Sequence, residues 1–469
     1  MKPAMHIPDN IAPDNASRRA FLRRSGALSL AASAAPWALA LSSIGDAAAQ
    51  SATDYKALVC VFLQGGNDTW NTVVPYDATH HALYQGLRSN IAYTRDALAA
   101  SALEPLGGSS DGRQFALAPT LATGLLPLFR QGRLAVVHNV GTLVQPTTKA
   151  QYQARSVPLP PKLFSHNDQQ SYWQASSAEG ATSGWGGRMG DLFASGNGTS
   201  TFTCINVAGN AVFLSGDIAI PYQVTTSGAV PVNGIKSPLF GSSAASQALR
   251  QLMTAPSNHW LAHEHARVAQ RCIQAGEQIT SALAATPLPA PFPSGNRLAD
   301  QLGLVSRMIA ARQQLGVRRQ VFFVAIGGFD THDRQLAVHP GLLANVGDAL
   351  AAFHRATEVL GVAQQVTSFT ATDFGRTLVS NNDGSDHGWG SAQLVLGGAV
   401  QGGRLYGAAP VPAHNGPDDV GQGRLLPAVA VEQYAATMAR WFGVPAGDLP
   451  LVLPRLGNFG SADLGFMQV

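Results

Sequence analysis

Short unbroken apolar runs between glycine-rich turns constrain the fold of this 469-residue chain more than any other feature. Runs of this length that do not alternate with polar residues suit strands buried on both faces of a parallel sheet. Segments with helical periodicity lie between them, as at 342–361 and 430–444. The runs read ALVCVFLQGGND, RLAVVHNVG, QVFFVAIGGFD, QVTSFTATDFG and AQLVLGG. Strands that alternate with helices predict an α/β layered fold.

The middle of the chain differs from this pattern. Residues 242–314 read as largely helical and are interrupted by the proline-rich segment 285–296. We expect this part to be a helical insertion on the sheet rather than a separate domain. Residues 143–165 contain several prolines and predict a long loop, and long loops in compact domains are often functional.

The N-terminus predicts export. The segment SRRAFLR at 17–23 carries paired arginines, and a mildly apolar stretch then ends in GDAAAQ. This combination is typical of a twin-arginine signal peptide, which we expect at 1–49 and which the twin-arginine translocase would recognise. The mature domain at 50–469 would then be periplasmic or secreted. No apolar stretch of about 20 residues follows the signal, so we expect no stable membrane anchor.

Charge and cysteine content exclude several classes of protein. Without residues 1–49 the chain has 26 basic and 25 acidic residues, which does not suggest a nucleic-acid-binding protein. Cys60 lies in an apolar run and predicts a buried core position. Cys204 and Cys272 could pair in an oxidising compartment, and their spacing does not decide this. The cysteine spacing matches no zinc-finger pattern.

Carboxylates and imidazoles follow several of the predicted strands. In open α/β sheets, ligands bind outside the carboxyl ends of the strands, so these positions predict a site. Singly, such an aspartate is more often a helix cap, but their recurrence in one chain favours a metal centre. Oxygen and imidazole ligands suit Zn, Mn, Mg or Ca. The residues are Asp68 after the first run, Asp330 and His332 after a later one, Asp373 after another, and His387 just beyond it.

Several of these motifs together resemble a known bacterial family. LVCVFLQGGNDTWNTVVP, LFSHNDQQSYWQ, GGFDTHDRQ, TDFGRTLVSNNDGSDHGWG, GGAVQGGRLYG and the tail at 423–444 resemble the family known as domain of unknown function 1501. That family is similar to the alkaline phosphatase and sulfatase superfamily. The resemblance therefore implies an alkaline-phosphatase-like three-layer sandwich with a mostly parallel central sheet. It also implies one or two divalent metal ions, but fold alone does not settle the reaction.

The resemblance assigns roles residue by residue. It implies Asp68 and Asp373 for one metal, Asp330, His332 and His387 for the other, and Ser165 for the nucleophile.

Two departures from the superfamily pattern leave one metal site a ligand short. Asp330 and His332 are only two residues apart, closer than the superfamily spacing. Phe374 stands where the superfamily usually has a histidine after the returning aspartate. His166, next to the expected nucleophile, is the candidate substitute.

Two functions remain open from the sequence. The first is an exported metal-dependent hydrolase of small anionic phosphate or sulfate esters, in which Ser165 attacks and Arg376 holds the anionic oxygens. Ser165 equally suits a helix cap, and Arg376 an ion pair with a nearby acid. Thr69 is a competing nucleophile. The second function is a non-catalytic secreted binding or assembly protein that retains the fold and at most one structural metal.

Overall fold

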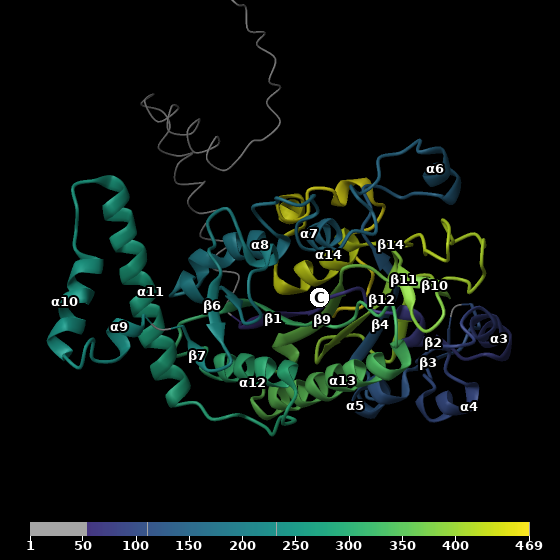
Figure 1. Cartoon of the computed structure of the whole chain (residues 1–469), viewed down its shortest axis with the longest axis horizontal. Helices are drawn as coiled ribbons and strands as arrows, with labels where there is room; N and C mark the ends of the chain where they lie inside the picture. Colours follow the sequence, from purple (N-terminus) through teal and green to yellow (C-terminus); the bar gives the residue numbers. More distant parts are fainter. Residues whose placement is uncertain (1–53, 110, 231, 469) are drawn as a thin grey trace, which may run out of the picture. The chain divides into compact units, whose positions relative to one another are not determined.

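A ten-stranded, mostly parallel sheet forms the centre of the molecule (Figure 1). The computed structural model describes residues 54–109, 111–230 and 232–468, so the predicted signal peptide lies outside the described residues. The strand order is β13-β4-β12-β9-β1-β8-β5-β6-β7, and β14 pairs with β4. The strands are β1 (Lys56–Leu63), β4 (Leu134–Gly141), β5 (Cys204–Asn206), β6 (Tyr222–Thr225), β7 (Gly228–Ala229), β8 (Arg319–Ile326), β9 (Val366–Thr372), β12 (Ser391–Gly397), β13 (Arg404–Tyr406) and β14 (Val429–Ala430).

All five apolar runs identified in the sequence form strands of this sheet. β1 pairs in parallel with β8 on one side and with β9 on the other, which places it at the centre. β12 runs antiparallel to β4 and β9, and β7 runs antiparallel to β6. Two small ribbons lie outside the main sheet: β2 (Val73–Pro75) with β3 (Phe115–Leu117), and β10 (Arg376–Ser380) with β11 (Ser385–His387).

Helices cover both faces of the sheet, which makes three layers (Figure 1). Along β1, Val59 and Val61 point into one core, and Cys60 and Phe62 point into the other. This alternation follows from the two-residue period of a strand. The expected three-layer α/β sandwich is therefore confirmed. The longer helices are α3 (Ala78–Leu87), α5 (Pro119–Arg130), α7 (His166–Ala175), α8 (Trp185–Phe193), α10 (Ser243–Thr254), α11 (Trp260–Ala284), α12 (Arg297–Ala310), α13 (Gln335–Val359) and α14 (Val431–Phe442).

Short helices join these elements. They are α4 (Arg95–Leu98), α6 (Lys149–Ala154), α9 (Asn233–Lys236) and α15 (Leu449–Val452).

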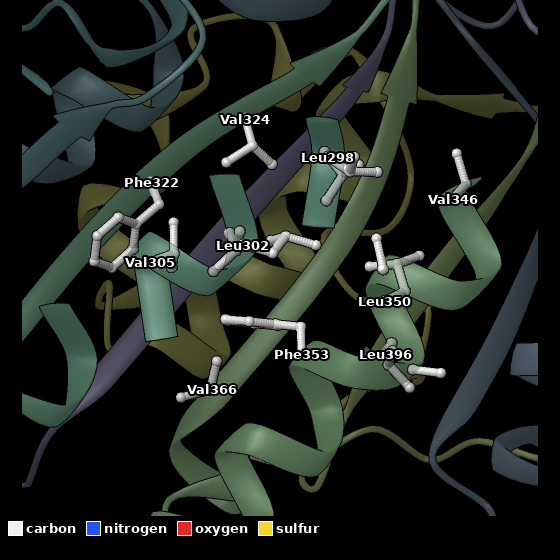
Figure 2. Packing of buried hydrophobic residues seen from close by; sticks show 14 of the residues in the cluster. Leu298, Leu302, Val305, Phe322, Val324, Val346, Leu350, Phe353, Val366 and Leu396 are labelled. Carbon is white, nitrogen blue, oxygen red and sulfur yellow. The ribbon is translucent and has the colours of Figure 1, made fainter. Parts of the chain in front are cut away.

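The first core lies under α5, α12 and α13. Figure 2 shows Leu302 of α12 and Phe353 of α13 beside Phe322 of β8 and Val366 of β9. The second core lies under α7, α8, α14 and α15. α13 is long and apolar enough to cross a membrane by length and composition, with a mean hydropathy of 1.3 over its most apolar window. Half of that window is buried in the protein, as expected for a core helix.

The helical middle of the chain contains both exposed and buried elements. α12 is buried against the sheet, whereas α10 and the first half of α11 extend away from it (Figure 1). That residues 242–314 are an insertion remains a prediction. The cysteines are all free: Cys60 and Cys204 are buried, and Cys272 is exposed on α11.

Candidate metal centre

Three loops that follow neighbouring parallel strands carry the candidate site. Leu63 of β1 is paired with Ile326 of β8 and with Thr372 of β9, so the three strands end together. Gly65 has a φ of +114°, and a Cβ atom there would lie 2.4 Å from the backbone nitrogen of Asp330. Glycine at this position therefore allows the loop after β1 to approach the loop after β8 this closely.

Three imidazoles surround the carboxylate of Asp330. The Nε2 atoms of His332 and His387 lie 3.1 and 3.2 Å from Asp330 Oδ1. His166 Nε2 lies 3.4 Å from Asp330 Oδ2. The Nε2 atoms of His332 and His387 are 2.9 Å apart. Three separate segments of the chain contribute His166, Asp330 and His387. Each residue offers one ligand atom, and these atoms lie within 4.8 Å of one another.

The other nitrogen of each imidazole is anchored away from Asp330. The anchoring distances are 2.6 Å from His166 Nδ1 to Asp373 Oδ2, 3.0 Å from His332 Nδ1 to Asp386 Oδ1, and 2.8 Å from His387 Nδ1 to the Phe164 carbonyl. Because a carbonyl oxygen only accepts, His387 carries a proton on Nδ1. The carboxylate partners favour the same tautomer in the other two rings. In the neutral rings, all three Nε2 lone pairs then face Asp330.

This arrangement fits one divalent cation. Lone pairs from three imidazoles and a carboxylate repel at these distances unless a proton or a metal cation lies among them. A tetrahedral zinc ion with ligands at about 2.0–2.1 Å separates its ligand atoms by about 3.4 Å. Metal-binding histidines usually donate their other N–H to a carboxylate or a carbonyl. His166, Asp330 and His387 therefore suit an ion directly, and His332 lies next to them.

The electrostatics of the cluster favour an ionised Asp330. Burial alone would raise its pKa, but the hydrogen bond and charge of Arg376, with the nearby His166 and His332, hold this pKa below its ordinary value. The pKa of His166 is raised, chiefly by its hydrogen bond to Asp373. The pKa of His387 is lowered, chiefly by burial, and the charges of His166 and Arg376 act in the same direction.

The resemblance implied Asp373 as a direct metal ligand, but in the structure its carboxylate is hydrogen-bonded to His166. Its side chain is fully buried and accepts from His166 Nδ1 at 2.6 Å and from Gln170 Nε2 at 2.8 Å. Its other oxygen accepts from the backbone N–H of Gly65 at 3.2 Å. Asp373 thus anchors His166 on the side of the ring away from Asp330, and that it also binds a metal directly stays a prediction.

Asp68 also differs from the expectation that it joins the cluster. It is fully buried and forms an ion pair with Arg88. Gln335 donates to the same oxygen, and the Trp70 N–H donates to the other at 3.2 Å. Asp68 is thus an N-cap of the short 3-10 helix Thr69–Asn71 and the counter-ion of a buried guanidinium. That Asp68 binds a metal stays a prediction, and its ion pair with Arg88 argues against it.

Arg376 forms an ion pair with a nearby acid, which was the alternative to its holding the anionic oxygens of a substrate. Its guanidinium is fully buried and donates to Asp330 Oδ1 at 2.7 Å and to the Gly65 carbonyl at 3.1 Å. Its remaining nitrogens donate to the carbonyl and the hydroxyl of Ser385. Each of its nitrogens has a protein partner, so Arg376 stabilises the loop of Asp330, and that it holds a substrate oxygen stays a prediction.

Ser165 lies next to the cluster but its hydroxyl has another partner. It occupies the N-cap position of α7, directly before His166, and is half-buried. Its Oγ donates to Asp168 Oδ2 at 3.3 Å rather than capping the helix backbone. The loop that was predicted at 143–165 contains the short helix α6, and it ends beside the cluster.

Sequence reasoning missed two arginines near the centre. Arg424 donates to the backbone carbonyl of His387 at 3.1 Å, and its guanidinium lies 4.3 Å from the ring centroid of Phe164. Within the described part of the chain its two terminal nitrogens have no hydrogen-bond partner, so they are free to meet an anion. Arg88, the partner of Asp68, was the other. Arg88 lies outside every motif, and Arg424 lies at the start of the tail motif at 423–444, where no signal in the sequence connects it with the strand ends.

The fold and the cluster define an α/β protein with an imidazole and carboxylate centre at the carboxyl ends of its central strands. The chain belongs to the family described as Protein of unknown function (DUF1501), whose model matches residues 55–449. The resemblance seen in the sequence motifs is thereby confirmed. No curated protein matches the chain in sequence.

Several solved structures are similar to the chain at low sequence identity. They include the lipoteichoic acid synthase LtaP of Listeria monocytogenes, at 8% identity and a TM-score of 0.32, with 86% of this chain and 76% of that chain covered. They also include the sulfatase PsFucS1 of a Pseudoalteromonas species, at 8% identity and a TM-score of 0.34, with 87% and 73% covered. These similarities are too distant to transfer a residue's role.

Proposed function

We propose that this chain is a metal-dependent hydrolase of phosphate or sulfate esters. The observation that carries the proposal is the convergence of three imidazole Nε2 atoms on Asp330, each ring being anchored through Nδ1. His166, Asp330 and His387 would hold one divalent ion, with His332 at its edge. Such an ion polarises an ester oxygen and offsets the charge that develops on it.

Ser165 is our candidate nucleophile. It directly precedes His166 at the start of α7, which places its backbone next to the cluster. Asp168, which now accepts its hydrogen at 3.3 Å, is a buried carboxylate placed to take the proton. Ser165 can act as the nucleophile only if its hydroxyl turns from Asp168 toward the bound ester and comes within reach of it.

Arg424 is our candidate for binding the anionic oxygens, in place of Arg376. It is half-buried beside His387 and Phe164, and its terminal nitrogens have no partner among the described residues. A guanidinium presents paired N–H groups that match phosphate and sulfate oxygens. Arg424→Ala should raise KM for such an ester and lower kcat/KM by about 10- to 100-fold, the loss of a charged hydrogen bond. Arg424→Lys should restore part of the loss.

Export completes the proposal. Residues 1–49 would direct the folded protein to the twin-arginine translocase, and the substrate would be a small anionic ester in the periplasm or outside the cell. Folding before export allows a metal to be loaded in the cytoplasm. Fractionation of cells that express the tagged full-length chain tests this part. The chain should appear in the periplasmic or secreted fraction, and it should stay in the cytoplasm when Arg18 and Arg19 are both replaced by Lys.

Turnover of aryl phosphate and aryl sulfate esters tests the activity. Purified protein should cleave at least one of them, lose activity on chelation, and regain it with Zn or Mn. His387→Asn should abolish turnover and bound metal together, whereas His263→Ala, on the exposed part of α11, should change neither. Ser165→Ala should abolish turnover and leave the metal in place. A Ser165→Ala variant with full activity would exclude Ser165 as the nucleophile.

The contact between Ser165 and Asp168 favours a second candidate function. A secreted binding or assembly protein with one structural metal would also keep the anchored imidazoles, and its serine would need no freedom to turn. Turnover distinguishes the two functions. Chelation would lower the melting temperature of either protein, but the metal-loaded binding protein would cleave neither ester.

A further inference from the structure

We propose that the buried guanidinium of Arg88 occupies the place of a second metal ion, so that the centre takes one divalent cation. This rests on the proposed metal-dependent function, and it adds the number of ions and the residue that sets it. The contacts of Asp68, the surroundings of Asp373 and the charge of the whole cluster lead to it.

The first argument is that Asp68 already has a permanent cation. Arg88 and Asp68 form an ion pair in which both side chains are fully buried. Arg88 is held from the other side, where Nη1 donates to the carbonyls of Thr377 at 2.6 Å and Leu378 at 3.2 Å. A metal on Asp68 would have to displace this guanidinium and leave it buried without a counter-ion, which is strongly unfavourable.

The second argument is that the remaining ligands for such an ion are missing. The carboxylate of Asp373 already accepts three hydrogen bonds, from His166, Gln170 and the Gly65 N–H. Phe374, at the position after it, offers no ligand atom. Its ring instead packs against the imidazoles, with centroids 4.9 Å from His166 and 4.6 Å from His387.

The third argument is the charge of the connected network. Gln335 joins the two halves, because its Nε2 donates to Asp68 and its Oε1 accepts from Ser385, which also accepts from Arg376. The network contains four carboxylates and two guanidiniums: Asp68, Asp330, Asp373 and Asp386 with Arg88 and Arg376. With neutral imidazoles its net charge is two negative, which one divalent cation neutralises. A second divalent ion would leave the network with a net charge of two positive.

Counting bound metal tests the proposal without reference to activity. The purified full-length mature chain, dialysed against Zn or Mn, should hold one equivalent by elemental analysis. Asp330→Asn should lose it. The double variant Asp68→Asn with Arg88→Met removes the buried pair while keeping its volume, and it should keep one equivalent.

A gain of metal provides the complementary test. Arg88→Ala leaves Asp68 without its cation and opens space beside it, so this variant should bind a second equivalent, and its melting temperature should rise more with metal than that of wild type. If Arg88→Ala fails to fold, the double variant still tests the proposal. Two equivalents in wild type, or loss of metal in the folded double variant, would overturn the proposal and leave the hydrolase function standing. No bound metal in wild type would overturn both.

Discussion

Asp373 contacts the candidate centre through His166, and we expect its role there to be indirect. Its oxygen lies 2.6 Å from His166 Nδ1, on the side of the ring opposite to Asp330. The sequence placed Asp373 at the right strand end, but it could not show that His166, more than 200 residues earlier, would come between this carboxylate and the centre. Asp68 differs for the same reason, because its partner Arg88 lies outside every motif. Contacts between distant segments decide which aspartate is a ligand and which is a partner.

Asp373→Asn tests this indirect role. An amide in place of the carboxylate weakens the anchoring of His166, and loss of such partners typically lowers metal affinity by about 10- to 100-fold. A calorimetric titration of the metal-free protein with Zn measures the affinity. Asp111→Asn, in an exposed loop, is the matched control and should leave it unchanged. Complete loss of binding in a folded Asp373→Asn protein would instead make Asp373 a direct ligand.

The loop after β1 is an element on which the geometry of the centre depends. Gly65 adopts a left-handed conformation, and its Cα approaches the backbone of Asp330 so closely that a methyl group would collide with it. Sequence reasoning predicted a tight turn here from the paired glycines. The close contact with the loop after β8 could not be predicted, because it depends on the parallel pairing of β1 with β8.

Gly65→Ala should therefore destabilise the fold and disturb the centre. The strained backbone costs about 1–3 kcal/mol of the free energy of unfolding, and displacement of Asp330 should weaken metal binding as well. Gly86→Ala is the control, since Gly86 lies in α3 with open space around it and should be neutral or stabilising by up to about 1 kcal/mol. Denaturant unfolding of both variants measures the difference. Equal stabilities would show that the two loops do not pack as described.

α14 begins with a buried acid that makes stability depend on pH. Glu432 lies in its first turn and is fully buried. Burial raises its pKa from 4.5 to about 7, against the charges of Arg455 and Arg188. The unfolded chain therefore loses this proton at lower pH than the folded protein does. Stability should fall as pH rises from about 4.5 to about 7, and the loss should stay constant above that.

Glu432→Gln should remove this loss. The variant should gain little at pH 5 and about 3 kcal/mol of unfolding free energy at pH 8, an order-of-magnitude value for the size of the shift. Denaturant unfolding at the two pH values gives the difference between variant and wild type. Glu104→Gln, which replaces an exposed carboxyl, is the control. A gain in Glu432→Gln that is equal at both pH values would contradict a protonated Glu432 in the folded protein.

For the whole molecule, the sequence predicted the sheet better than it predicted the site. Each apolar run is long enough to cross the sheet and is bounded by glycine, so the strand positions could be identified from the local sequence. The positions of α13 and α14 could be identified from their helical periodicity. The set of strand ends at which the polar residues gather was also predictable, because parallel strands share an edge. The roles of Asp68, Asp373 and Arg376 were not, since each depends on a partner brought close only by folding.

The central claim is that His166, Asp330 and His387 together bind one divalent metal ion. Crystals of the mature protein grown with Zn and measured at the zinc absorption edge test it most directly. The account predicts one anomalous peak per chain, about 2.0–2.2 Å from His166 Nε2, His387 Nε2 and an Asp330 carboxylate oxygen. It would be contradicted by a fully folded chain with no peak among these atoms, or by a peak bonded to Asp68 with Arg88 displaced.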